Sequence, residues 1–207
     1  MSAPAPSAGM LLVHGELDRA VAWARRGVVS VHAVPLGAWV ALVPAADRSL
    51  AAAPYDEPVG PLLARSVPRR LRGAIGVATV GPRVVLSLVP HVLRHTRRWL
   101  VWEPGQGLIR VGTLPPGTIT DLAATAGARE HAEAVARVLR DVRGSAEQVV
   151  ADTLAAVRLP GAELVGAPEA AARHTGSVLV EPAEHQVRRF ERAAHEDRTW
   201  RSEVEGR

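Results

Sequence analysis

The stretch GVVSVHAVPLGAWVALVPAA, residues 27–46, decides how the N-terminal half of this chain folds, because none of its 20 residues is arginine, aspartate or glutamate. An apolar segment of this length is long enough to span a bilayer as a helix. However, Pro35-Leu36-Gly37 lies at its centre, between arms rich in valine, alanine and tryptophan. Turn residues between β-prone arms are typical of a buried β-hairpin. The stretch therefore predicts paired strands, and we expect no membrane span.

Two further hairpins are predicted along the chain. One turns at Gly81-Pro82, and the other turns at Pro104-Gly105-Gln106-Gly107, the clearest turn signal in the sequence. Connections this short join antiparallel strands, because a parallel pair needs a crossover of about a dozen residues. We therefore expect an α+β domain over residues 10–112, with a mainly antiparallel sheet built of β-hairpins and one or two helices. The predicted strands span residues 10–14, 28–34, 38–43, 74–80, 83–89, 98–103 and 108–112, and the predicted helices span 16–26 and 59–64.

The two valine-rich hairpins also suggest an internal duplication. Residues 31–44 can be laid on residues 77–90 without a gap, and valine, leucine and proline coincide at several positions. A chain this rich in valine and proline produces such coincidences by chance. Duplication and shared turn chemistry both remain open.

The pattern changes to helical after Pro115-Pro116-Gly117. Apolar residues recur at helical spacing over 129–143 and again over 146–157, with Gly144-Ser145 between them. This pattern predicts a helical hairpin over residues 113–160 that packs on the sheet domain. Outside these regions we expect a disordered tail at 1–9. In the segment 161–207 we expect a loop, a short strand at 177–180, and a charged C-terminal helix that begins at Pro182.

The charge composition is less informative than it looks. All 25 basic residues are arginine, and lysine, cysteine and asparagine are absent. Such a composition points to a GC-rich genome, as in actinobacteria. Because arginine stays protonated, the isoelectric point near 11.0 reflects the residue type, while the net charge is only +4. Without cysteine there can be no disulfide and no thiolate metal site, which fits a cytoplasmic location.

A basic segment with interleaved tryptophan is one candidate site. Arg94, His95, Arg97 and Arg98 precede Trp102 in the sequence, and arginine beside aromatic rings can contact phosphates and stack on bases. This pattern makes nucleic acid a candidate partner. If residues 98–102 form a strand, alternation places Trp102 on the face of Arg98 and Trp99 on the other face, so one tryptophan belongs to the core.

Catalytic motifs are scarce. The sequence contains no glycine-rich phosphate loop, no nucleophile elbow and no His-Glu-x-x-His motif. His91 and His95 have metal-ligand spacing on a helix, but they lack a nearby carboxylate, and we predict neither a metal nor a cofactor. The loop with Tyr55, Asp56 and Glu57 remains the one candidate site for a small-molecule enzyme.

The C-terminal helix provides the main functional prediction. Its apolar stripe is thin, and such helices often reach a partner or a second subunit. Val187, Phe190 and Trp200 are the candidate contact residues, because aromatic residues flanked by arginine dominate interface hot spots. We therefore predict a non-catalytic binding or regulatory protein that acts through contact with a protein partner or through self-association. A nucleic-acid-binding protein using the Arg94–Trp102 region and an enzyme using the Tyr55–Glu57 loop are the alternatives.

Overall fold

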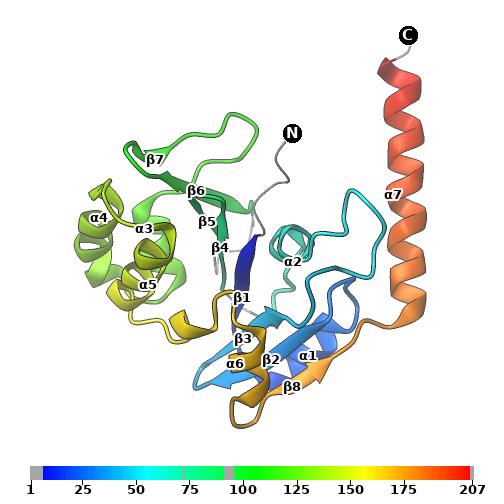
Figure 1. Cartoon of the computed structure of the whole chain (residues 1–207), viewed down its shortest axis with the longest axis horizontal. Coiled ribbons are helices and arrows are strands. Elements are labelled where there is room, and N and C mark those ends of the chain that lie inside the picture. Colours follow the sequence, from blue (N-terminus) through cyan, green and yellow to red (C-terminus); the bar gives the residue numbers. More distant parts are fainter. Residues whose placement is uncertain (1–6, 72, 91–95, 206–207) are drawn as a thin grey trace.

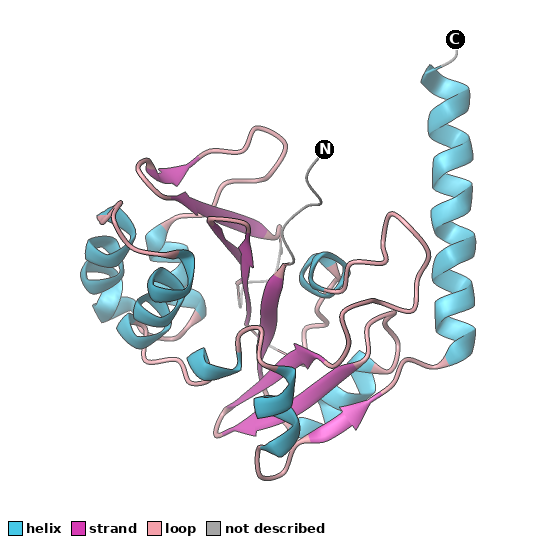
Figure 2. Ribbon diagram, viewed as in Figure 1, coloured by secondary structure: helices cyan, strands magenta, loops and turns pink. Residues whose placement is uncertain are grey.

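The computed structural model describes residues 7–71, 73–90 and 96–205. Across these residues a single eight-stranded sheet runs through the molecule in the order β7-β6-β5-β4-β1-β3-β2-β8. Every ladder between neighbouring strands is antiparallel, which confirms the predicted α+β class with an antiparallel sheet (Figure 2). The strands are β1 (Ala8–His14), β2 (Val31–Leu36), β3 (Trp39–Pro44), β4 (Ala74–Val80), β5 (Arg83–Val89), β6 (Arg98–Glu103), β7 (Gly107–Ile109) and β8 (Val178–Val180).

Strand β1 lies between the two valine-rich hairpins. Its Leu12 is opposite Ala41 of β3 on one side and opposite Ile75 of β4 on the other. The two hairpins turn at Gly37 and Gly81, which have φ values of 68° and 56°, a conformation that glycine adopts without strain. The gapless overlay of the sequences places Gly37 on Arg83, beyond the second turn. The turns therefore do not coincide in that overlay, which favours shared turn chemistry over duplication.

Both faces of the sheet are buried, and the alternation of side chains along β1 shows how. Met10 and Leu12 belong to one apolar cluster, whereas Leu11 and Val13 belong to another, and all four are fully buried. Because successive side chains on a strand point to opposite faces, these clusters lie on opposite sides of the sheet. A continuous apolar run such as residues 39–43 is thus required by burial on both sides.

Helices cover the two faces separately, as Figure 1 shows. The first cluster receives α3, α4, α5 and α6, and the second receives α1 and α2. A capping box forms at the start of α3, where the Thr118 hydroxyl accepts a hydrogen bond from the Asp121 amide and the Asp121 carboxylate accepts one from the Thr118 amide. The helices are α1 (Leu17–Ala24), α2 (Val59–Ala64), α3 (Ile119–Thr125), α4 (Ala132–Arg140), α5 (Ala146–Ala156), α6 (Pro168–Arg173) and α7 (Glu184–Glu205).

The C-terminal segment contributes more to the fold than the sequence predicted. Strand β8 falls within the short strand predicted at 177–180, and it pairs with β2 and closes one edge of the sheet. Helix α6 lies in the segment predicted to be a loop. At the other end, β1 begins at Ala8, inside the tail predicted to be disordered. The sheet therefore extends beyond the predicted domain of residues 10–112 at both ends of that range.

Helix α7 leaves the body of the molecule after β8 and runs along one side of it, with its C-terminal end far from the sheet (Figure 1). Its start is held by the Ala183 amide, which donates to the Arg25 carbonyl at 2.8 Å. None of the helices among the described residues combines the length and apolar character needed to cross a bilayer.

Candidate functional site

A pocket of about 540 Å³ lies where the lower half of α7 meets the body. Its wall comes from the end of α1, from α2, from the loop before α2, from β6 and from α7. The wall is mainly apolar, and three aromatic side chains, Tyr55, Trp99 and Phe190, contribute to it. Residues distant in sequence thus converge on one concave surface of a size typical of ligand sites.

The loop that precedes α2 is fixed by its own polar groups. The Ser49 hydroxyl donates to the Tyr55 carbonyl at 2.6 Å, and the Asp56 carboxylate forms an ion pair with Arg48 at 2.7 Å. The two carboxylate oxygens of Glu57 accept hydrogen bonds from the amides of Val59 and Gly60, at 2.8 and 2.7 Å. Glu57 therefore caps α2.

The structure separates the two carboxylates of the loop proposed as a small-molecule enzyme site. Tyr55 and Glu57 reach the pocket wall, whereas Asp56 does not line the pocket and points to Arg48 instead. Both oxygens of Glu57 are engaged by backbone amides, which keeps it in a structural role. The two carboxylates of the predicted pair thus face different partners.

Two arginines supply the charge of the pocket. Arg65, at the end of α2, stacks over Trp23 with its Cζ 4.1 Å from the ring centroid. Burial, and to a lesser degree the positive charge of Arg26, lowers the pKa of Arg65 to about 10. Among the described residues, no carboxylate forms an ion pair with Arg26 or Arg65. Two guanidinium groups therefore share one side of the pocket without an acidic partner.

Arg97 contacts two residues of the pocket wall, Arg65 and Trp99. Its guanidinium donates a hydrogen bond to the Arg65 carbonyl and lies 5.9 Å from the ring centroid of Trp99. Burial lowers the pKa of Arg97. Within the residues that the structure describes, its Nε has no hydrogen-bond partner. Arg97 is thus placed to position Arg65 and Trp99.

The predicted nucleic-acid site does not form a single exposed surface. Arg94 and His95 lie outside the described residues, as does the His91–His95 pair. Arg98 places its Nη1 2.7 Å from both carboxylate oxygens of Asp121. Trp102 is buried, and its indole donates to the Asp141 carbonyl at 3.1 Å. Trp102 cannot stack on a base, because α4 and α5 cover the face of the sheet to which it points.

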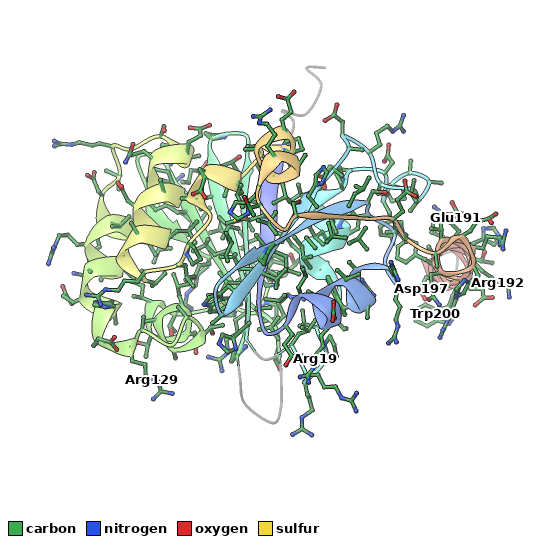
Figure 3. All side chains as sticks on the ribbon, turned by 90° about the horizontal axis from the view of Figure 1, so that it is seen from below. Arg19, Arg129, Glu191, Arg192, Asp197 and Trp200 are labelled. Atoms are coloured by element: carbon green, nitrogen blue, oxygen red, sulfur yellow. The ribbon has the colours of Figure 1, made fainter. Side chains whose placement is uncertain are left out.

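The predicted contact residues of α7 fall into two groups. Val187 and Phe190 are half-buried, and Phe190 meets Tyr55 edge to face with ring centroids 5.2 Å apart. Further along, Arg198 donates to the Ala53 carbonyl at 3.1 Å. Trp200 is 65% exposed. In Figure 3, which looks along α7, Glu191, Arg192 and Trp200 point in different directions around the helix.

The sequence did not show which residues lie together around this pocket. It indicated Tyr55 and Phe190 separately, and only the fold joins them. Neither Arg26 nor Arg65 was among the candidate site residues, because nothing in the local sequence brings the end of α1 to the end of α2. Across the described ranges of the chain, histidine and carboxylate side chains form no group of three able to hold a metal.

Comparison with known proteins finds no matching protein family, no similar curated protein and no similar solved structure.

Proposed function

We propose that this chain is a non-catalytic binding or regulatory protein of the bacterial cytoplasm, with α7 as the element that docks a protein partner or a second copy of the chain. The observation that carries the proposal is the exposure of α7. This helix has 22 residues. Up to Trp200, the last residue of α7 whose side chain is described, only the side chains near its start, together with Ala194, are partly covered by the body.

Energetics support a partner for the outer half of α7. Ordering a residue costs about 1 kcal/mol or more, whereas an i,i+4 ion pair such as Glu184–Arg188, at 2.6 Å, contributes only about 0.2–0.5 kcal/mol. Local pairs alone therefore do not compensate for the ordering of a 22-residue helix. Burial of an exposed tryptophan against a partner supplies a large favourable term. Trp200 is the residue best placed to provide it.

Photo-crosslinking tests this proposal directly. A benzophenone amino acid is introduced at position 200 in one variant and at position 192 in another, and both are irradiated in the native cell. We expect an adduct from position 200 and little or none from position 192, because the two side chains point in different directions around α7 (Figure 3). An adduct of twice the chain mass identifies self-association, and any other mass identifies a different protein.

Two results of the crosslinking experiment would contradict the proposal. Equal adducts at the two positions mean random collision, and no adduct at position 200 means that Trp200 has no partner. Either result overturns the proposal. Recovery of nucleic acid in a salt-dependent manner would instead support the nucleic-acid alternative.

A further inference from the structure

We propose that the pocket between α2 and α7 binds a small organic anion with a flat apolar body, such as an aromatic carboxylate. This site is separate from the contact surface proposed at Trp200. Three features carry the proposal: the charge of the pocket, the way in which Arg65 is held, and the aromatic walls.

The pocket carries a net positive charge, because two arginines and one glutamate line it. Arg26 and Arg65 line it without an ion-pair partner among the described residues, and Glu57 is the one acidic residue on its wall. Both oxygens of Glu57 point to the amides at the start of α2. A partly buried cation is costly without a counter-charge. An anionic group on a ligand would supply the missing partner.

Arg65 is held in place before any ligand arrives. Its guanidinium stacks on Trp23 at 4.1 Å and packs against the backbone at Gly27, where an added Cβ would lie only 2.8 Å from its Nη1. The Trp23 indole is itself fixed by a hydrogen bond of 2.9 Å to the Ser66 carbonyl. The carbonyl of Arg65 accepts a hydrogen bond from Arg97. A group fixed in this way loses little entropy on binding, which favours affinity.

The aromatic walls define the rest of the ligand. Tyr55, Trp99 and Phe190 present ring surface around the pocket, so a bare phosphate or sulfate would leave most of the wall uncovered. A neutral apolar molecule would cover the rings and leave both guanidinium groups without a counter-charge. A flat apolar body that carries one anionic group satisfies both kinds of wall.

Two fluorescent dyes with the same aromatic body separate charge from shape. Anilinonaphthalene sulfonate carries one negative charge, and phenylnaphthylamine is neutral. We expect the full chain to bind one molecule of the anionic dye. Arg65→Met and Arg26→Met should each weaken this binding by about tenfold, because a charge-assisted contact is lost. The neutral dye should bind the wild type more weakly than the anionic dye does, and it should respond to neither substitution.

Two further variants serve as controls. Arg19→Met removes the same charge from α1, where Arg19 is exposed, pairs with Glu16 and lies away from α7 (Figure 3), so it should leave dye binding unchanged. Ala64→Trp fills the pocket and should abolish binding of both dyes. A thermal melt of each variant without dye shows that it is folded. Arg26 is exposed, so Arg26→Met keeps the test informative if Arg65→Met unfolds.

Several results would overturn the proposal. One is equal binding of the two dyes, which would indicate an apolar surface made for a partner's side chain. Another is binding of the anionic dye that survives Ala64→Trp, or that falls equally with Arg19→Met. None of these results affects the crosslinking test at position 200, so the two proposals can fail independently.

Discussion

Arg98 and Arg65 lie on opposite faces of the same sheet and differ in what surrounds them. Arg98 meets both carboxylate oxygens of Asp121, which also caps α3, so its charge is neutralised within the fold. Arg65 has an aromatic ring and a second arginine as neighbours instead. The same residue type thus completes the structure on one face and leaves an unneutralised charge on the other. Whether an arginine has a structural or a binding role therefore depends on the groups that the fold places beside it, and sequence composition does not reveal these groups.

The largest loss of stability is expected on the face of the sheet where Arg98 is paired with Asp121. Trp102→Ala should lower the free energy of unfolding by about 3–5 kcal/mol, because it removes a large buried side chain and leaves a cavity against α4 and α5. Urea unfolding of the purified chain measures this change. If Trp102→Ala costs no more than the same substitution at the exposed Trp200, then the assignment of Trp102 to the core is wrong.

Asp121→Ala removes the ion pair with Arg98 and the hydrogen bonds that the Asp121 carboxylate accepts from Thr118 at the start of α3. We expect this substitution to lower the free energy of unfolding by about 1–2 kcal/mol. Burial opposes ionisation of Asp121, but hydrogen bonds from Arg98 and Thr118 outweigh it and lower the pKa of this carboxyl.

The sign of the pH dependence follows from that lowered pKa. The advantage of the wild type over Asp121→Ala should be complete above about pH 5 and should shrink as the pH falls below about 4, the value for an unfolded aspartate, towards the lower folded value. Unfolding of both proteins across this range measures it. A difference that stays constant with pH would show that the hydrogen bonds do not depend on the carboxylate charge.

The sequence predicted local elements well where apolar runs are bounded by turn residues. The predicted bounds of β4, β5, β6 and α2 are those of the structure. By contrast, α6 was not predicted, because its six residues are too few to show helical periodicity. Strand β8 falls within the predicted range 177–180, but its place at the edge of the sheet depends on pairing with the distant β2. The central position of β1 also depends on pairing between distant segments.

The candidate site was also harder to predict, because it depends on contacts between segments that are distant in the sequence. Strand alternation placed Arg98 and Trp102 on one face, which the structure bears out, but alternation does not tell which face is covered by helices. The contact between Tyr55 and Phe190 depends on the path of α7 past the loop before α2. The prediction of α7 as a docking element remains a proposal, because exposure shows where a partner can bind and not that one does.

Paired substitutions of the two arginines test the comparison itself. Arg98→Met should destabilise the fold by about 1 kcal/mol, because Asp121 keeps its charge and loses its partner. Arg65→Met should change stability by less than this, or should raise it, since folding disfavours the charged form of a base whose pKa is lowered. That penalty on the charged form is complete below about pH 10 and is therefore present at neutral pH. Thermal melts of both variants measure the contrast, and equal losses would remove the distinction between the two faces.

The smallest effect on stability is expected at Trp200. Because this side chain is 65% exposed, Trp200→Ala should change the free energy of unfolding by no more than about 0.5 kcal/mol. Phe190→Ala is the matched control on the same helix, and it should cost more, since Phe190 packs against Tyr55. Light scattering of both variants then reports assembly. The docking proposal expects Trp200→Ala to abolish self-association, or to reduce binding of a partner captured at position 200. In either case the unfolding midpoint should stay the same, and the outer half of α7 is then a docking element. A large loss of stability would instead show that Trp200 packs against the body of its own chain. If neither the assembly state nor partner binding changes, the outer half of α7 does not have the role proposed for it.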